Sequence, residues 1–245
     1  MGHLTKSNRA FFVTGTDTEV GKTCISKGLL LALDKMGYST VAYKPIAAGC
    51  ENTPDGLRNE DALILQRHSN IELQYDEVNP IAFEAAIAPH LALKALAGSD
   101  DVHFIPVDKI REGFVHLLQK EPNVILVEGA GGWRLPLGGS YLGRPRYLSE
   151  FVSELNLSVI LVVGMRLGCL NHAVLTAEAI SNDGLKIAGW VANQVDPDMV
   201  LVDENIESLK SLLDAPFLGN VPQLSGDDHA GNYLNLGRLG LSAEI

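Results

Sequence analysis

Short apolar runs rich in Val, Ile and Leu recur along the chain, and segments of mixed polarity separate them. The runs lack the strict alternation of a sheet with one solvated face, which is typical of parallel strands that helices cover on both sides. They lie at residues 10–14, 40–43, 124–127, 159–163, 187–192 and, more weakly, 216–219. We therefore predict that these runs form a buried and mostly parallel sheet.

The segments between the runs place apolar residues at helical spacing. In 22–35 the side chains of Ile25, Leu29 and Leu33 fall on one side, and Gly37 follows as a stop signal. Further helices are predicted at residues 61–66, 108–119, 148–155, 171–180 and 204–213. Strands that alternate with helices in this way predict an α/β protein with a three-layer, doubly wound, mostly parallel sheet.

Two segments are too rich in glycine, proline and polar residues to fit this alternation. Residues 46–59 and 129–145 are each predicted to be a long loop. Both follow the carboxyl end of a predicted strand, where open α/β sheets bind ligands. Long loops inside compact domains tend to be functional or disordered. We therefore expect a binding site near these two segments.

Composition narrows the class of protein. The chain has 245 residues, of which 46% are hydrophobic, and a formal net charge of −11. It is too apolar for a disordered polymer and long enough for one large core, and we predict a single domain over residues 1–245. The acidic balance argues against binding to nucleic acid or to an anionic membrane surface, although it permits a local basic pocket.

The cellular compartment is predicted from the apolar stretches, the N-terminal segment and the cysteines. No apolar stretch approaches the ~20 residues of a membrane span, and the N-terminal segment MGHLTKSNR has no apolar signal core. Cys24, Cys50 and Cys169 are far apart and odd in number, so we expect neither a disulfide framework nor a cysteine metal cluster. These features predict a cytoplasmic protein.

The strongest local motif is GTDTEVGKT at residues 15–23, between the first predicted strand and the first long predicted helix. A turn that ends in Gly-Lys-Thr directs backbone N–H groups at phosphate oxygens, and the helix dipole adds attraction. In such a loop Lys22 reaches the β- and γ-phosphates and the Thr23 hydroxyl ligates Mg²⁺. Five residues, rather than the usual four, separate Gly15 from Gly21, and an ordinary strand–turn–helix is the alternative. We favour nucleotide binding because strand, loop and helix come in the required order.

Two acidic residues are candidate ligands for this metal ion, because Mg²⁺ prefers oxygen and phosphoryl transfer commonly uses a carboxylate at a strand end. Glu128 ends a buried run. Gly129, Ala130 and Gly131 follow it, and such small residues let a substrate or phosphate approach the backbone. Asp61 stands at the start of a predicted helix. From sequence alone, Glu128 could equally cap the next segment and Asp61 could be a helix N-cap.

Two further segments carry candidate ligand groups. Lys44 stands at the tip of the second predicted strand, where it could place a second positive charge beside a transferring phosphate, although most lysines are solvated. The link 164–171 joins a strand to a helix, and its free N–H groups would suit a carboxylate. Asn171 could instead be no more than an N-cap.

The end of the strand at 187–192 carries a candidate base-binding pair. Asn193 and Gln194 are similar to the Asn-Lys-x-Asp motif of GTPases, but Gln194 occupies the lysine position. An asparagine can both donate to and accept from a purine edge. The alternative is a turn residue before Asp196.

Together these residues resemble the dethiobiotin synthetase family, the ATP-dependent ring-closing ligases of biotin biosynthesis. The matching segments are FVTGTDTEVGKT at 12–23, YKP at 43–45, TPDGLRNEDAL at 53–63, VEGAGGW at 127–133, LGCLNH at 167–172 and GWVAN at 189–193. Several motifs in one order are far more specific than a single phosphate loop. The resemblance implies a P-loop NTPase-like fold, a homodimer, and binding of ATP, Mg²⁺, 7,8-diaminononanoate and CO₂, with no nucleic-acid or membrane partner.

The resemblance also implies a role for each matching residue. Lys22 and Lys44 would be catalytic and would stabilise the carbamate and the transferring phosphoryl group, and Mg²⁺ would be held by Thr23, Asp61 and Glu128. The nucleotide would contact Glu19, Val20, Gly21, Lys22, Thr23, Cys24, Asp61, Glu128, Gly129, Ala130, Gly131, Asn193, Gln194, Pro222, Gln223 and Leu224. The diamine would contact Thr18 and, from the partner subunit, Gly168, Cys169, Leu170 and Asn171.

This chain departs from the family pattern at three places. Ala48 stands where the family often has serine, which removes a hydroxyl contact to the substrate. The segment from Arg134 to Arg146 is longer than usual and carries three arginines. It could serve as a lid, an anion contact or an inert insertion, of which we favour the last. The acidic residue that the family often places past the adenine strand falls near residues 227–229, which leaves the ribose contact open.

A nucleotide-dependent switch of the partition-ATPase type, which binds a protein or DNA partner, is the main alternative. It shares the phosphate loop, the parallel sheet and dimerisation. The acidic charge argues against it, and such switches do not need the motifs at 43–45 and 167–172. A GTPase is disfavoured by Gln194 in the base motif. The synthetase is therefore the function that we expect.

Overall fold

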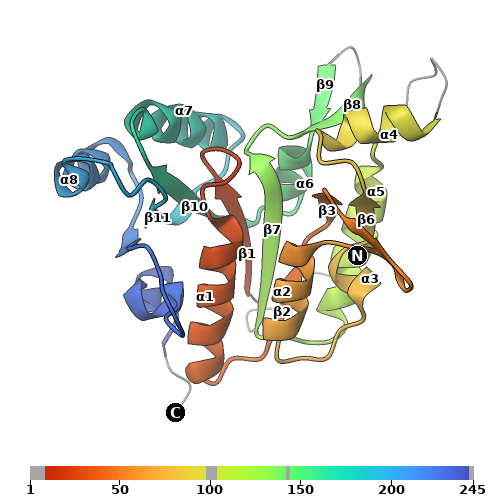
Figure 1. Ribbon diagram of the computed structural model, residues 1–245, viewed down its shortest axis with the longest axis horizontal. Coiled ribbons are helices and arrows are strands. Elements are labelled where there is room, and N and C mark those ends of the chain that lie inside the picture. Colours follow the sequence, from red (N-terminus) through yellow and green to blue (C-terminus); the bar gives the residue numbers. More distant parts are fainter. Residues whose placement is uncertain (1–8, 98–103, 142–143, 243–245) are drawn as a thin grey trace.

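Six parallel strands form the central sheet of the computed structural model, which describes residues 9–97, 104–141 and 144–242. Their order across the sheet is β12-β11-β10-β1-β7-β2 (Figure 1). They are β1 (Arg9–Gly15), β2 (Thr40–Tyr43), β7 (Val124–Gly132), β10 (Ser158–Met165), β11 (Ile187–Gln194) and β12 (Phe217–Val221). Each strand overlaps one of the apolar runs, which confirms the mostly parallel sheet.

The strand order reverses at β1, which pairs with β7 on one side and with β10 on the other. The chain runs from β1 to β2 at one edge, returns through β7, and then builds the other half through β10, β11 and β12. Gly15 of β1 pairs with Gly132 of β7, so these two strands end side by side. Doubly wound sheets bind ligands outside the carboxyl ends at such a reversal. The topology therefore places a binding site after β1.

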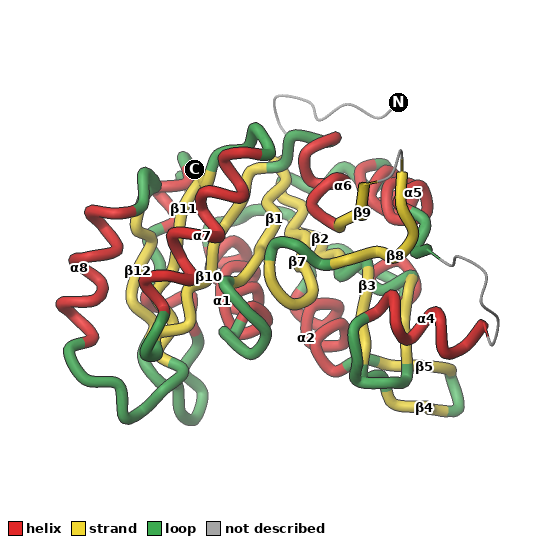
Figure 2. Tube along the Cα trace, turned by 90° about the horizontal axis from the view of Figure 1, so that it is seen from above, coloured by secondary structure: helices red, strands yellow, loops and turns green. Residues whose placement is uncertain are grey.

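Helices cover both faces of the sheet. They are α1 (Lys22–Lys35), α2 (Glu60–His68), α3 (Tyr75–Val78), α4 (Pro89–Ala97), α5 (Val107–Leu118), α6 (Leu148–Glu154), α7 (Cys169–Asn182) and α8 (Val202–Leu212). Helices α1 and α2 lie on one face, and α5 and α6 lie on the other (Figures 1 and 2). This is the predicted three-layer arrangement. Among the described residues, no helix has the length and apolar character needed to cross a membrane.

The predicted apolar stripe of α1 packs into the core. Ile25, Leu29 and Leu33 are at most 1% exposed, and burial of each such side chain contributes roughly 1.5–3 kcal/mol. A second apolar cluster, with Leu161 and Trp190 at its centre, joins β10 and β11 to α7 and α8. The sheet is thus fixed firmly on both faces, and the segments beyond its carboxyl edge project from a rigid base.

The segment 46–59, predicted as a long loop, contains three short strands instead. β3 (Ile46–Ala48) pairs in parallel with β6 (Ile81–Phe83), and β4 (Glu51–Thr53) pairs antiparallel with β5 (Gly56–Arg58). The polar residues that suggested a loop form the turn of this hairpin. Thr53 Oγ1 donates to the Gly56 carbonyl oxygen at 2.7 Å, and Gly56 adopts a φ of 99°, which favours glycine. The prediction was wrong because turn residues dominate so short a hairpin.

The segment 129–145 is also not one loop. β7 continues to Gly132, and β8 (Pro136–Tyr141) forms an antiparallel hairpin with β9 (Arg144–Tyr147). The buried side chains of Leu135 and Leu137 anchor it. Its glycines hid the strands because they contribute no apolar side chain to the pattern. Residues 142 and 143 lie outside the described part of the chain.

The stretch between α2 and α5 carries elements that the sequence did not predict. They are the four-residue α3, strand β6 and helix α4. Helix α3 packs under the end of β2, where the Lys44 N–H donates to the Val78 carbonyl oxygen at 2.8 Å. A single helical turn is too short to show a periodic pattern. This region nevertheless supports the site described next.

Candidate active site

The turn between β1 and α1 has the form of a phosphate-binding loop. Helix α1 begins after Gly21, which adopts a φ of 84°, and no side chain caps its first N–H groups. By contrast, the side chain of Asn59 caps α2. The uncapped N–H groups of α1 are open to an anion, which the helix dipole also attracts. The predicted order of strand, turn and helix is thus confirmed.

A buried asparagine holds this loop in place. Asn193, near the end of β11, is 6% exposed and donates from Nδ2 to the Val20 carbonyl oxygen at 2.9 Å. A Cβ atom on Gly21 would collide with the same amide nitrogen, so only glycine fits there. Because Asn193 lies within a strand, its interpretation as a turn residue was wrong.

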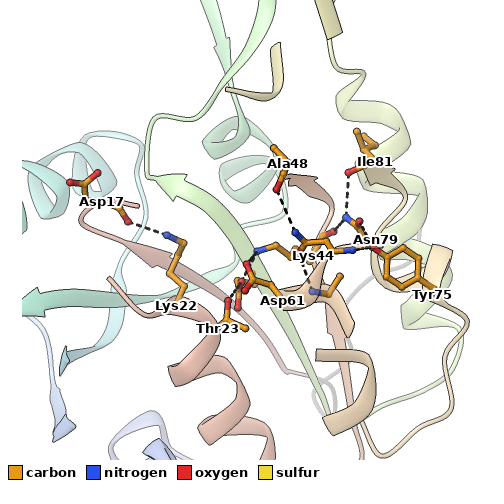
Figure 3. A network of polar contacts seen from close by, with 12 residues as sticks. Asp17, Lys22, Thr23, Lys44, Ala48, Asp61, Tyr75, Asn79 and Ile81 are labelled. Carbon is orange, nitrogen blue, oxygen red and sulfur yellow. Dashed lines mark hydrogen bonds and ion pairs between the residues drawn. The ribbon is translucent and has the colours of Figure 1, made fainter. Parts of the chain in front are cut away.

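Lys22 is buried at the start of α1, and its amine lies at the loop. The Nζ atom donates to the Asp17 carbonyl oxygen at 3.0 Å (Figure 3). Burial lowers the pKa of Lys22 to about 8, although the nearby Glu128 opposes this effect. The Asp17 carboxylate is paired with Arg166, from the link between β10 and α7, at 2.6 Å. The Lys22 ammonium would therefore gain stabilisation from an anion bound in the loop.

A second buried lysine lies at the centre of the site. Lys44, just after β2, is 4% exposed, so its interpretation as a solvated residue was wrong. Its Nζ lies 2.6 Å from Glu128 Oε1 and 3.1 Å from Asp61 Oδ2 (Figure 3). Burial disfavours its charge, but the two carboxylates outweigh burial and raise the pKa of Lys44. Burial would raise the pKa of Asp61, but Lys44 outweighs it and lowers this pKa overall.

The three residues expected to hold Mg²⁺ lie together around this lysine. Thr23 Oγ1 donates to Glu128 Oε1 at 2.9 Å. Asp61 joins this group because Lys44 Nζ pairs with both Asp61 Oδ2 and Glu128 Oε1. The other oxygen of Glu128, Oε2, is buried and has no hydrogen-bond partner within the described residues. An unpartnered buried carboxylate oxygen is costly, and a divalent cation would satisfy it. A hydroxyl and two carboxylates are also ligands that Mg²⁺ accepts, so the residues fit this ion.

The alternative interpretations of these residues as helix caps were wrong. Glu128 lies within β7, and the N-cap of α2 is Asn59, whose Oδ1 accepts from the Ala62 N–H at 3.2 Å. Asp61 is the second residue of α2, which leaves its carboxylate available to Lys44. In the same way, Gly168 rather than Asn171 is the N-cap of α7.

A cavity of about 750 Å³ opens over these groups. Its polar lining consists of Thr18, Glu19, Lys22, Thr23, Lys44, Asn59 and Asp61. The remaining lining is apolar or glycine and consists of Gly21, Ala47, Ala48, Ala86, Ile87, Ala88, Pro89, Ala130, Gly131 and Leu135. A cavity that combines a charged region with small apolar side chains suits a small molecule with both kinds of group.

Part of this lining was not among the predicted site residues. Residues 86–89, which lead into α4, carry no motif that could have revealed them. Asn59 lay inside the segment predicted as a loop, although an asparagine directly before Glu60 and Asp61 is an N-cap signal. Leu135 was likewise hidden in the glycine-rich segment.

Several predicted nucleotide residues lie outside this cavity. Val20, Cys24, Glu128, Gly129, Asn193, Gln194, Pro222, Gln223 and Leu224 do not line it. Glu128 does not line the cavity itself but accepts hydrogen bonds from Thr23 and Lys44, which do. Gln194 Nε2 donates to Asn220 Oδ1 at 3.1 Å. The segment 222–224 directly follows β12, on the same edge of the sheet as the loop. Because β12 and β2 form opposite edges of the sheet, the segment 222–224 lies on the other side of the loop from Lys44.

The predicted substrate residues are divided. Thr18 lines the cavity, whereas Gly168, Cys169, Leu170 and Asn171 do not. The latter four begin α7, whose first N–H groups also have no side-chain cap. Leu167, directly before them, is 97% exposed. Within one chain, this helix start therefore contributes nothing to the lining of the cavity.

The two remaining departures from the family pattern have structural answers. Arg134 pairs with Asp183, and Arg146 pairs with Glu150, so two of the three arginines of this segment are engaged within the fold, and the third, Arg144, is exposed. This favours a structural hairpin over an anion contact. His229 Nε2 lies 3.3 Å from Lys35 Nζ at the opposite end of α1 from the phosphate loop, which does not support a ribose contact there.

The fold and the turn before α1 place the protein in the P-loop class of α/β nucleotide-binding proteins. Solved structures with this fold include a ParA family ATPase from Chlorobium tepidum, with a TM-score of 0.52 and 14% identity over 90% of this chain and 86% of that one. The MinC:MinD cell division complex of Aquifex aeolicus gives a TM-score of 0.51 and 15% identity over 88% of this chain and 82% of that one. A domain family described as an AAA domain matches residues 9–228.

Curated relatives identify the family more closely. The ATP-dependent dethiobiotin synthetase BioD of Cellvibrio japonicus is 49% identical over 232 residues, which cover 94% of this chain and 97% of the relative. The protein of the same name from Pseudomonas aeruginosa is 50% identical over 95% of this chain and 98% of the relative. This chain belongs to the dethiobiotin synthetase family.

Proposed function

We propose that the protein is an ATP-dependent dethiobiotin synthetase, which closes a cyclic urea from 7,8-diaminononanoate and CO₂. The observation that carries the proposal is the convergence of Lys22, Lys44 and three magnesium-compatible oxygen ligands at one cavity with an apolar wall. Relatives about half identical in sequence, over nearly the whole chain, support the same activity. We take residues 1–245 as one P-loop domain.

The chemistry explains why a nucleotide is needed. One amine of the substrate attacks CO₂ and loses a proton, which gives a carbamate. A carbamate oxygen attacks the γ-phosphorus of ATP and displaces ADP, so that a carbamic–phosphoric anhydride forms. The second amine then attacks the carbonyl carbon, phosphate leaves, and a proton is released as the ring closes. No step requires a covalent enzyme nucleophile, and positioning and charge stabilisation are sufficient roles for the protein.

Each charged residue has a place in this scheme. Lys22 and the N–H groups of the loop would hold the β- and γ-phosphates. Lys44, held between Glu128 and Asp61, would lie beside the carbamate and the phosphoryl group in transfer. Mg²⁺, held by Thr23, Asp61 and Glu128, would supply positive charge to the phosphate oxygens when bound. On the loop's other side, Asn193 and the segment 222–224 would bracket adenine.

The apolar wall suits the hydrocarbon chain of the diamine. Ala47, Ala48 and Ile87 offer methyl and methylene surface next to Lys44, and Thr18 lies at the same cavity. The substrate carboxylate, at the far end of the chain, would bind the uncapped start of α7. Because that helix start does not line the cavity of its own chain, we propose a homodimer in which the partner subunit supplies it. The free thiols of all three cysteines agree with a cytoplasmic enzyme.

The test is the dependence of phosphate release on both small substrates. With ATP and Mg²⁺, we expect release only when diaminononanoate and bicarbonate are both present, and we expect chelation of the metal to stop it. A nucleotide switch of the partition-ATPase type would release phosphate without either substrate, or in response to DNA or a protein. The likeness to such switches rests on fold at 14–15% identity and does not favour that function.

A further inference from the structure

A chain of buried hydrogen bonds behind the site centres on Tyr75, the first residue of α3. The Asn59 N–H donates to the Tyr75 hydroxyl oxygen at 2.7 Å, and this hydroxyl donates to Asn79 Oδ1 at 3.0 Å. Asn79 Nδ2 then donates to the Lys44 carbonyl oxygen at 2.7 Å (Figure 3). The three side chains in this chain of bonds, Asn59, Tyr75 and Asn79, are all at most 7% exposed.

One end of this series of hydrogen bonds lies at the start of the helix that carries Asp61. Asn59 caps α2 through Oδ1, and its carbonyl oxygen accepts from the Leu63 N–H at 3.0 Å. Asp61 is two residues further along, in the first turn of the same helix. A residue in the first turn moves with the helix start, so the Tyr75 hydroxyl is linked through Asn59 to the helical turn that carries Asp61.

The other end of the series lies at the backbone of Lys44. The peptide groups of this residue are held on both sides by the end of α3, because its N–H donates to the Val78 carbonyl oxygen and its carbonyl oxygen accepts from Asn79. Asn79 is itself bonded to the Tyr75 hydroxyl. The same hydroxyl thus joins the backbone of Lys44 to the helix that carries Asp61.

We propose that Tyr75 is a positioning residue for the reaction, which acts by fixing the separation between Lys44 and Asp61. The proposal rests on the function proposed above. A buried polar chain contributes less to stability than its bonds suggest, because each group also loses its hydration. Its benefit is a single geometry, and that geometry is needed where charges must be held to within a fraction of an ångström. Phenylalanine in place of Tyr75 would leave the packing and remove only this link.

The structure offers a matched control in Tyr43. Its hydroxyl is also buried and donates to a backbone oxygen, that of Ile110, at 2.8 Å. Tyr43 directly precedes Lys44 in the chain, but its hydroxyl lies against α5 and is not bonded to the residues of the site. Tyr75→Phe and Tyr43→Phe therefore remove the same group from comparable surroundings, and only the first breaks the link.

We expect Tyr75→Phe to lower kcat by at least about 10-fold while KM for ATP stays within about 2-fold, because the phosphate loop is untouched. Tyr43→Phe should change neither constant by more than about 2-fold, at a temperature where both variants are folded. Asn79→Ala should resemble Tyr75→Phe, and the double variant should lose little more than the larger single effect. Asn79→Ala also carries the test should Tyr75→Phe not fold. Equal kcat values for the two phenylalanine variants, or multiplicative losses in the double variant, would overturn the proposal.

A second measurement needs no turnover. In Tyr75→Phe the Asn59 N–H loses its acceptor, so amide hydrogen exchange over the first turn of α2 should become faster, whereas Tyr43→Phe should leave it unchanged. A wild-type protein without diamine-dependent activity would refute the proposed function, and the exchange result would then decide whether the link exists. Unchanged exchange at Asn59 in Tyr75→Phe would contradict it.

Discussion

At the scale of single residues, the site depends on two buried lysines with different surroundings. Lys22 donates to a backbone carbonyl oxygen, and burial lowers its pKa to about 8. Lys44 lies between Glu128 and Asp61, which outweigh the effect of burial and raise its pKa. Lys22 therefore gains most from an arriving phosphate, whereas Lys44 is already paired and held in position. We therefore propose that Lys22 serves mainly in nucleotide binding and that Lys44 serves the transferring group.

Removal of either charge should slow the reaction strongly. We expect Lys22→Gln and Lys44→Gln each to lower turnover by at least about 10²-fold, the cost of losing one preorganised charge. The measurement is the rate of dethiobiotin formation at saturating substrates, with melting temperatures recorded because Lys44→Gln leaves two carboxylates unpaired. Lys109→Gln, on the exposed side of α5, makes the same change away from the site and should be as active as wild type. Near-normal rates in either site variant would remove the role of that lysine.

The sequence predicts Lys22 and Lys44 unequally well. Lys22 belongs to a continuous motif whose strand, turn and helix are all local, so its place could be foreseen. The pairing of Lys44 with Glu128 joins residues 84 positions apart and depends on β2 lying beside β7. Sequence patterns for strands carry no information about which strands become neighbours. Its place at a strand tip made Lys44 a candidate, but only the resemblance to a family favoured a catalytic lysine over a solvated one.

At the scale of elements, the four-residue α3 has more contacts than its length suggests. The carboxylate of Glu77, a residue of α3, accepts from the Gln74 N–H at 2.6 Å. It also pairs with His116 at 2.7 Å and with Lys120 at 2.9 Å. Burial works against its charge, but these partners outweigh it and lower the pKa of Glu77 to about 2. Glu77 therefore ties the element that carries Tyr75 to α5.

This ion cluster should make stability depend on acid pH. The folded pKa of Glu77 is below its unfolded value of 4.5, so its contribution is present above about pH 4.5 and is lost as the pH falls toward 2. We expect Glu77→Gln to lower the free energy of unfolding by about 1 kcal/mol at pH 7, and by less at pH 3. Urea unfolding at the two pH values measures this. Glu112→Gln, at an exposed position of α5, is the control. A difference in the free energy of unfolding between wild type and Glu77→Gln that grows in acid would contradict this role of Glu77.

The elements also show where sequence patterns lose power. The long strands and α1 were predicted to within a few residues, except that β7 continues five residues past its predicted run, because apolar runs and helical stripes extend over enough positions to be distinctive. The hairpins within 46–59 and 129–145 were taken for loops, because their glycine and turn residues outnumber the apolar ones. Elements of three or four residues, such as α3 and β6, have no pattern of their own. Tertiary neighbours position them, because α3 packs on α2, β2 and α5, and β6 pairs with β3.

At the scale of the whole molecule, the proposed site is larger than one chain. Lys22, Lys44 and Asp61 line the cavity, whereas the start of α7 lies outside it with Leu167 almost fully exposed. The uncapped N–H groups at this helix start would attract an anionic group such as the substrate carboxylate. The proposed dimer would complete each cavity with the partner subunit's α7.

Mixing of two defective variants tests this arrangement. Lys44→Gln damages the cavity, and Asn171→Glu places a negative charge at the helix start, where it repels the substrate carboxylate. A mixed dimer has one site with both parts intact. After subunit exchange at low diamine concentration, we therefore expect recovery to about a quarter of wild-type activity, since half of the dimers are mixed.

The control for this experiment mixes Lys44→Gln with Lys22→Gln. Both changes lie in the cavity half of the site. In a mixed dimer one cavity therefore lacks Lys44 and the other lacks Lys22, so neither site is intact. Activity should stay low in this mixture. Equal recovery in both mixtures, or none in the first, would refute a site shared between subunits.

The central claim is that ATP activates a carbamate formed from the diamine, and the fate of labelled carbon tests it most directly. Wild-type protein would receive ATP, Mg²⁺, 7,8-diaminononanoate and ¹³C-bicarbonate, with ADP and dethiobiotin quantified together by mass spectrometry. We predict that the ureido carbonyl carries the label and that one ADP forms for each dethiobiotin. ADP formed without the diamine, or no labelled cyclic urea despite ATP consumption, would contradict the account.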